Sequence, residues 1–206
     1  KICNTGIEYM QDWECYNEMI TRLGAPVNNF EKPKHFSRKQ VRSMGRVALM
    51  ATVATERALE DSQLLNDPVI TDGRMGVGYG SSTGSTDAVK DFGNMLLNHS
   101  SSKLNANTYL KMMSHTAAVN IGVFFGLKGR VIPTSSACTS GSQGIGFSYE
   151  AIKYGHQDLM VAGGAEELCP TEAAVFDTLF ATSTRNHEPN LTPRPFDKDR
   201  DGFVLG

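Results

Sequence analysis

Residues 131–146 read VIPTSSACTSGSQGIG, and this stretch decides the fold. β-branched and small residues over 131–136 predict a strand, and the glycine-rich half leads into a helical pattern over 140–154. Cys138 therefore falls at a turn from a strand to a helix. The unpaired N–H groups and the dipole of a helix N-terminus favour a thiolate over a thiol, and the thiolate is the nucleophile.

A second strand is predicted over 159–162, after Gly155 ends the helix. Two strands joined by a helix in this way are parallel, and the crossover between them is right-handed. An earlier strand over 75–79 runs into a turn of glycine and serine. The chain is therefore expected to be an α/β protein with a mostly parallel sheet.

Further helices are predicted where apolar residues recur at a spacing of three to four. Ser37 is the expected N-cap of the longest one. The predicted helices span residues 37–61, 86–97, 108–114, 117–125 and 172–180.

Other segments have weaker patterns. Residues 1–35 lack periodicity and are expected to form a loop with one short helix around 13–23. Residues 99–107 and 186–202 are predicted loops, whereas residues 203–206 are typical of part of a strand.

The composition is that of an ordinary globular protein, with 206 residues, 40% of them hydrophobic, 20% charged, and a net charge of -2. A chain of this length can bury a sizeable core as one large domain or two small ones. No excess of basic residues is available to neutralise phosphates, which argues against nucleic acid as a partner. No apolar run approaches the roughly 20 residues that span a bilayer, and no signal peptide is recognised, so no membrane association is predicted.

The chain has four cysteines and no CxxC pair. Such cysteines suit a reducing compartment better than a disulfide scaffold, so a cytoplasmic protein is expected. Cysteine is among the most buried residue types, so a structural role is the alternative for each of them. The four are Cys3, Cys15, Cys138 and Cys169.

The surroundings of Cys138 favour chemistry over a structural role. Gly141, Gly144 and Gly146 would let the helix backbone approach a neighbouring element closely. The N–H of Cys138 is expected to stabilise an oxyanion formed on a thioester carbonyl. One such donor is typically worth about 10²–10³ in rate.

Gly78, Gly80 and Gly84 run from the end of a predicted strand towards the start of a predicted helix. A dinucleotide-binding turn occupies this place in other proteins, but such a unit carries an acidic residue about 20 residues further on. The corresponding region, residues 99–103, reads HSSSK and contains no carboxylate. A tight packing turn is therefore favoured, and no cofactor is predicted.

A rival catalytic set consists of Ser136, Tyr149 and Lys153. Tyr149 and Lys153 share one face of the predicted helix, where a lysine can lower the pKa of a tyrosine. The set resembles that of the short-chain dehydrogenases, whose glycine motif opens the chain. Here the glycine turn is in mid-chain, so a reductase is the weaker alternative, and nicotinamide binding would revive it.

The histidines are dispersed and show no metal-ligand spacing, so no metal site is predicted. A cysteine nucleophile usually needs a base, and the sequence offers no obvious one. The histidines are His35, His99, His115, His156 and His187.

Residues 194–203 read RPFDKDRDGF. Aspartate and arginine alternating in a loop predict a clasp of ion pairs and hydrogen bonds, which would fix the loop. Phe203, at the end of this segment, is a candidate for the lining of a pocket.

In combination, these motifs resemble the β-ketoacyl-[acyl-carrier-protein] synthases, the condensing enzymes of fatty-acid and polyketide synthesis. The matching segments run through most of the chain in the family's order, and together they are specific where each alone is not. They are the helix from Ser37 to Asp61, GSSTGS at 80–85, GLKG at 126–129, SSACTSGSQGIG at 135–146, VAGGAEE at 161–167, FATSTRN at 180–186 and RPFDKDRDGFVLG at 194–206.

The resemblance implies a thiolase-like α/β/α/β/α sandwich built from two similar halves. Residues 1–206 would form its N-terminal domain, which is most of the first half and is truncated at both ends. The family's first strand would precede Lys1, and its two catalytic histidines and supporting lysine would follow Gly206. One departure is Arg130, where the family often has proline after the GLxG turn.

The resemblance also implies a reaction. Cys138 would take an acyl chain from an acyl-carrier-protein thioester, and the carbanion from decarboxylation of a malonyl thioester would attack that acyl group. Phe176 would line the acyl tunnel, and Phe203 would lie near the reacting centre. Members are typically homodimers, with the strand near Cys138 at the interface.

Two consequences of the resemblance are open to test. The 206 residues alone are not expected to condense substrates, because decarboxylation needs the family's histidines; turnover of malonyl-acyl-carrier protein by this chain would contradict that. A non-catalytic partner subunit, similar to a chain-length factor, is the other alternative. Such subunits usually lack the nucleophile, so Cys138 argues against it.

Overall fold

The computed structural model describes residues 5–206, so Cys3 lies outside the described residues. The chain divides into two compact units. One consists of Lys1–Glu31 with Glu167–Gly206, and the other of Lys32–Glu166. Each unit is described by itself.

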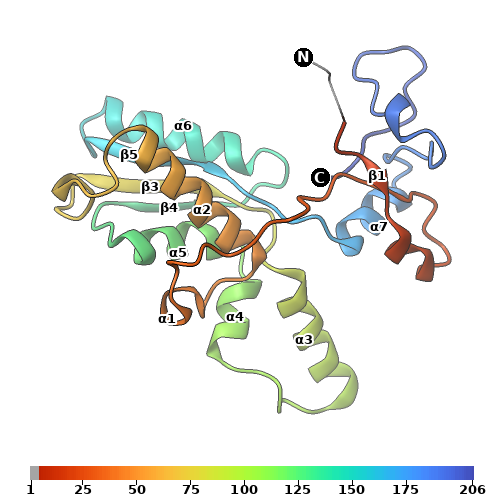
Figure 1. The fold of residues 1–206 in the computed structure, drawn as a ribbon, viewed down its shortest axis with the longest axis horizontal. Helices are drawn as coiled ribbons and strands as arrows, with labels where there is room; N and C mark the ends of the chain where they lie inside the picture. Colours follow the sequence, from red (N-terminus) through yellow and green to blue (C-terminus); the bar gives the residue numbers. More distant parts are fainter. Residues whose placement is uncertain (1–4) are drawn as a thin grey trace. The chain divides into compact units, whose positions relative to one another are not determined.

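The unit Lys32–Glu166 is built on a three-stranded parallel sheet with the strand order β4-β3-β5 (Figure 1). The strands are β3 (Met75–Gly80), β4 (Val131–Thr134) and β5 (Leu159–Gly164). This confirms the predicted parallel sheet. Strand β4 ends earlier than predicted, at Thr134, and Ser136 forms only an isolated bridge with Cys138.

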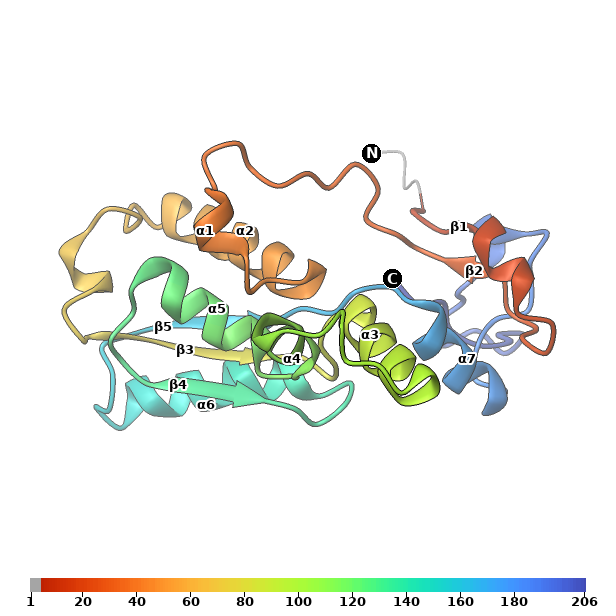
Figure 2. The same ribbon diagram turned by 90° about the horizontal axis from the view of Figure 1, so that it is seen from below.

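Helices cover both faces of this sheet. Figure 2 shows α2 (Arg46–Asp61) and α5 (Thr116–Phe125) on one face and α6 (Ser140–Lys153) on the other. An apolar core fills the space between the first face and its two helices. The helices contribute small and β-branched side chains, and β3 contributes a valine and a tyrosine. This core contains Val47, Ala51, Val77, Tyr79, Ala117, Ala118 and Ile121.

The predicted helix over residues 37–61 is wrong in one respect, because it is two helices. Ser37 caps α1 (Arg38–Val41) through a capping box with Gln40, as the sequence predicts. The break is at Gly45, the N-cap of α2, where a Cβ atom would collide with the side chain of Ser85. Close packing against a distant residue therefore sets the start of α2.

The remaining elements of this unit follow the predictions with small shifts. Helix α3 (Thr86–Asn98) ends one residue later than predicted, and α4 (Ala106–Met112) begins two residues earlier. The earlier start of α4 comes from the side chain of Asn105, which forms a capping box. Helix α5 ends at Gly126, with a φ of 67°, and a 3-10 helix, η2, spans Pro68–Ile70.

The other unit joins segments that are far apart in sequence. Two short strands, β1 (Glu8–Tyr9) and β2 (Leu23–Gly24), pair antiparallel. The helices are α7 (Pro170–Thr178) and the 3-10 helices η1 (Gln11–Cys15) and η3 (Pro189–Leu191). Trp13 and Met19 from the first segment bury against Ala173 from the second.

Three predictions for this unit need correction. The short helix expected around 13–23 is only a 3-10 helix that ends at Cys15, because the following residues pack around α7 instead. The predicted helix 172–180 begins at Pro170 and ends at Thr178. Residues 203–206 form no strand, but Phe203 and Leu205 make isolated bridges with Thr182 and Gly24. Over residues 5–206, no helix has the length and apolar character needed to cross a bilayer.

Candidate active site

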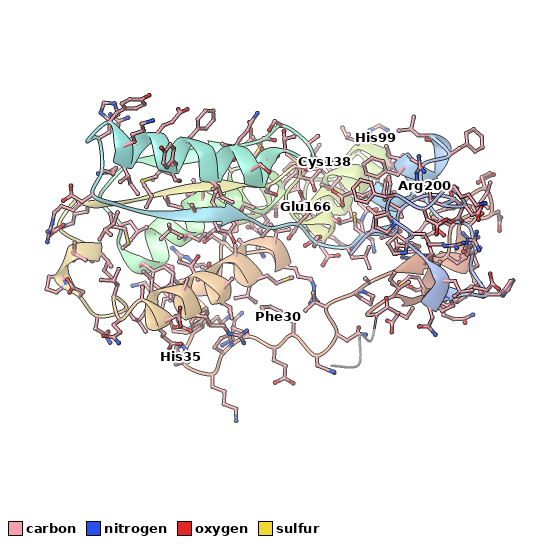
Figure 3. The ribbon with its side chains drawn as sticks, turned by 90° about the horizontal axis from the view of Figure 1, so that it is seen from above. Phe30, His35, His99, Cys138, Glu166 and Arg200 are labelled. Carbon is pink, nitrogen blue, oxygen red and sulfur yellow. The ribbon has the colours of Figure 1, made fainter. Side chains whose placement is uncertain are left out.

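Cys138 lies on the turn between β4 and α6, two residues before the first residue of the helix, and its side chain is exposed. Figure 3 shows it at the end of α6 that receives the chain from β4. The preceding residue, Ala137, has a φ of 52°, in the left-handed region that residues with a Cβ rarely adopt. The backbone is therefore held in a costly conformation immediately before the cysteine.

Hydrogen bonds from the turn's own side chains stabilise this conformation. The Ser136 N–H donates to Ser140 Oγ at 2.8 Å, and that hydroxyl donates to the Ala137 carbonyl oxygen at 2.6 Å. The Thr139 hydroxyl donates to the Ser136 carbonyl oxygen at 2.9 Å. The Ser136 hydroxyl donates to Gln143 Oε1 at 2.7 Å, which ties the turn to the first turns of α6. Cys138 is thus presented on a fixed turn with its thiol accessible.

Glycines allow α6 to lie directly on the sheet, as predicted for Gly141 and Gly144. A Cβ on Gly144 would lie 2.9 Å from the carbonyl oxygens of Gly78 and Gly163, and one on Gly164 would lie 2.8 Å from the Cα of Gly141. Gly146 is a correction, since nothing lies within 4 Å of its Cβ position.

The turn after β3 is also a packing turn, which confirms the interpretation of the glycine motif. A Cβ on Gly80 would lie 2.7 Å from the Gly141 nitrogen at the start of α6. The Ser81 N–H donates to the Thr134 carbonyl oxygen at 3.1 Å, and the Ala165 N–H donates to the Gly80 carbonyl oxygen at 3.0 Å. The carboxyl ends of all three strands therefore meet at this turn.

Glu166, which follows β5, is a residue of this site that the sequence reasoning did not single out. Its Oε2 accepts hydrogen bonds from the N–H groups of Ser82 at 2.6 Å and Thr83 at 3.4 Å. Its Oε1 accepts from the hydroxyls of Ser81 at 3.1 Å and Thr83 at 3.4 Å. Figure 3 shows Glu166 and Cys138 at the same end of the sheet.

Phe176 and Phe203, the two predicted pocket residues, contact each other in the unit that contains α7. Their ring centroids are 5.1 Å apart and the rings are nearly perpendicular, at 77°, which is a favourable edge-to-face arrangement. Phe203 is 40% exposed. A cavity of about 460 Å³ adjoins it, lined in part by Phe180, Arg194 and Arg200.

The predicted clasp near Phe203 is present in part, because Asp201 is held by residues 183–185 and not by the arginines of its own segment. Asp201 accepts hydrogen bonds from the Ser183 hydroxyl at 2.9 Å, the Thr184 N–H at 3.0 Å and Arg185 Nε at 3.3 Å. Partial burial opposes ionisation, but these hydrogen bonds outweigh it and lower the pKa of Asp201 below its usual value. Arg194 forms an ion pair with Asp197 at 3.2 Å, as the alternating charges predict.

The rival set of Ser136, Tyr149 and Lys153 does not assemble. Lys153 Nζ lies over the ring of Tyr149, 5.4 Å from its centroid. Ser136 precedes α6, whereas Tyr149 lies well inside it, about 13 Å from Ser140 at the usual helical rise. The part of the chain that the structure describes contains no group of three or more side chains able to hold a metal ion.

Comparisons with known proteins identify the family of the chain. The family model described as "Beta-ketoacyl synthase, N-terminal domain" matches residues 9–206. A 3-oxoacyl-[acyl-carrier-protein] synthase 2 of Vibrio cholerae is 36% identical over 204 residues, which cover 98% of this chain and 49% of that protein. The chain therefore belongs to the β-ketoacyl synthase family.

Solved structures show the same fold. The crystal structure of a β-ketoacyl synthase from Burkholderia phymatum is 54% identical with a TM-score of 0.95, and the match covers 98% of this chain and 50% of that one. A type II polyketide ketosynthase, solved with its acyl-carrier protein, has 24% identity and a TM-score of 0.72, with 98% and 49% covered. These are thiolase-like ketosynthases, and this chain has their α/β fold. It spans about half the length of the relatives it matches.

Proposed function

We propose that the protein is a condensing enzyme that joins an acyl thioester to malonyl-acyl-carrier protein in fatty-acid, polyketide or polyene synthesis, with Cys138 as the nucleophile. The observation that carries the proposal is the exposed Cys138 thiol on a hydrogen-bonded turn at the N-terminus of α6. A thiolate attacks thioesters readily, and a fixed exposed turn leaves it open to a long substrate.

Two bond exchanges make up the reaction. The Cys138 thiolate attacks the acyl carbonyl carbon, and the bond from that carbon to the carrier's sulfur breaks. The carrier leaves as a thiolate and takes up the proton that the Cys138 thiol gave up when it ionised. Malonyl-acyl-carrier protein then loses carbon dioxide, and the resulting carbanion attacks the acyl group on Cys138. The carbon–sulfur bond to Cys138 breaks, and the β-ketoacyl product stays on the second carrier. The Cys138 N–H is our candidate donor to the oxyanion of both additions.

Two phenylalanines are assigned to the substrate in this proposal. Phe176 lines the acyl tunnel and Phe203 lies near the reacting centre. Support comes from their mutual edge-to-face contact and from the partial exposure of Phe203, which leaves an aromatic surface available to an acyl chain. The clasp around Asp201 fixes the backbone that leads into Phe203.

The proposed function also implies binding partners and a cellular location for this protein. Acyl-carrier protein delivers both thioesters, and a second copy of the protein pairs along β4, an edge strand on which Val131 is exposed. The free thiols of Cys15, Cys138 and Cys169 suit a reducing cytoplasm. A chain-length-factor-like subunit is the alternative function, and the retained Cys138 counts against it.

A condensation assay on the complete protein tests this function. Acyl- and malonyl-acyl-carrier protein are supplied, and the β-ketoacyl product and carbon dioxide are measured. The wild type is expected to form both, C138A to form no β-ketoacyl product, and C15A, which alters another exposed cysteine, to match the wild type. Product formation by C138A at the wild-type rate would contradict the proposal.

A further inference from the structure

Glu166 makes an unusual set of contacts for a carboxylate. Four donors lie within hydrogen-bond distance of it, all from the short segment Ser81–Thr83 and none from its own neighbours in sequence. The two hydroxyls among them, of Ser81 and Thr83, also lie within reach of the Thr83 and Gly84 carbonyl oxygens, so the two backbone N–H groups are its constant donors. Two donors are backbone N–H groups that converge on one oxygen, and two are hydroxyls that converge on the other. Within residues 5–206 it forms no ion pair, so hydrogen bonds alone account for its contacts.

The segment that Glu166 holds is in direct contact with the Cys138 turn. The Ser81 N–H donates to the last residue of β4, and the Ser135 hydroxyl approaches the Ser82 carbonyl oxygen at 3.5 Å. The Thr134 hydroxyl in turn donates to the Ser140 carbonyl oxygen at 2.7 Å, in the first turn of α6. A continuous set of contacts therefore runs from Glu166 through Ser82 to both sides of the cysteine.

We propose that Glu166 is a positioning residue for the reaction: it fixes the Ser81–Thr83 segment against Ser135, and so sets the direction in which Cys138 meets an acyl thioester. This inference rests on the proposed function. Glu166 follows β5, at the carboxyl ends of parallel strands, where α/β proteins place their ligand sites. The apolar core on the sheet lies at other residues, so Glu166 is not needed to form it.

Two substitutions separate the reach of this side chain from its charge. Glu166→Gln keeps the length: its carbonyl oxygen accepts from the two N–H groups, and its amide donates to the hydroxyls, which rotate to accept. Glu166→Asp keeps the charge but is one methylene shorter, which withdraws both oxygens from their donors. Positioning requires the length, so Gln is expected to rescue function and Asp is not.

The test is a single-turnover acylation of the complete protein by acyl-acyl-carrier protein, followed by mass spectrometry of Cys138. The maximal rate and the half-saturating concentration are measured separately for wild type, E166Q, E166D and E166A. Glu150→Ala is the matched control, because Glu150 is an exposed carboxylate on α6. The rate of Cys138 alkylation by iodoacetamide reports the accessibility of the thiol without a carrier protein.

In E166D and E166A the Ser81–Thr83 segment is no longer held, so Cys138 is expected to be displaced. The maximal acylation rate is expected to fall by about tenfold to a hundredfold, because a small displacement of a reacting group lowers a rate by that factor. Their half-saturating concentrations are expected to stay close to that of the wild type, since carrier binding is untouched. E166Q and E150A are expected to acylate at rates close to the wild type. Thermal unfolding confirms that each variant is folded at the assay temperature.

Several results would overturn the inference. E166D and E166A acylating at the wild-type rate would do so, and so would E166Q falling as far as E166D, which would assign the effect to charge. If E166A does not fold, the comparison of E166D with E166Q decides alone. Absence of acylation on wild-type Cys138 would instead refute the proposed function, so the two failures are distinguishable.

Discussion

Ala137 has an unfavourable backbone conformation directly before the candidate nucleophile. Its φ of 52° costs roughly 1–2 kcal/mol for a residue with a Cβ. Hydrogen bonds from Ser136 and Ser140 within the turn offset this cost and hold the conformation. The turn held in this way presents Cys138 as an exposed residue.

A second residue-scale feature, Asp201, makes stability depend on pH. Its pKa is lowered in the folded protein by the hydrogen bonds from Ser183, Thr184 and Arg185. The stabilisation is therefore present above the unfolded pKa of about 3.9 and is lost as the pH falls through the lower folded value.

Asp201→Asn removes this charge. The variant is expected to lose roughly 1–3 kcal/mol of stability at neutral pH, because charged hydrogen bonds are lost. Its stability should also fall less steeply than that of the wild type below about pH 4. Unfolding curves in denaturant at several pH values measure both effects, with Asp199→Asn as the exposed control. Equal pH dependence in wild type and D201N would show that Asp201 is not the titrating group.

At the scale of elements, α6 contains two glycines that face different surroundings. A Cβ on Gly144 would press on the carbonyl oxygens of Gly78 and Gly163, whereas one on Gly146 would meet nothing within 4 Å. Because the opposing atoms at Gly144 are backbone, the helix itself would have to move away from the sheet.

Gly144→Ala and Gly146→Ala therefore have opposite predicted effects. Alanine in a helix gains about 1 kcal/mol over glycine at either position. At Gly144, overpacking costs typically 1–3 kcal/mol and is expected to outweigh that gain, lowering the melting temperature. At Gly146 the gain remains, and the melting temperature should hold or rise. Thermal unfolding of the two variants checks this; a more stable G144A would mean that α6 does not depend on close packing.

Elements with a strong local sequence pattern could be predicted from the sequence. The strands β3 and β5 and the helices α5 and α6 have strong periodicity or clear glycine ends, and they appear where predicted. The break at Gly45 was missed because it depends on contact with Ser85, forty residues away. The β1–β2 pair was missed because residues 5–31 pack with a segment that begins at Glu167.

The candidate site shows the same division. Cys138 is predictable because its signal lies in neighbouring residues, but Glu166 is not, because its partner Ser82 is 84 residues away. The contact between Phe176 and Phe203 was also not predictable from the sequence, which marked Phe203 as a pocket residue and assigned Phe176 only by resemblance. A side chain whose partners are far away in the sequence produces no local sequence pattern, so its role cannot be predicted from neighbouring residues.

At the scale of the whole molecule, the chain consists of two compact units, and each contains residues that we propose to act in the reaction. Lys32–Glu166 contains the nucleophile turn and Glu166, and the other unit contains Phe176 and Phe203. The relatives it matches are about twice as long as this chain. The central claim is that Cys138 carries the acyl group.

Mass spectrometry after incubation of the complete protein with acyl-acyl-carrier protein tests that claim most directly. The account predicts an added acyl mass on the peptide containing Cys138, and none on that peptide in C138A. An acyl adduct located on Cys3, Cys15 or Cys169 instead, with Cys138 unmodified, would contradict it.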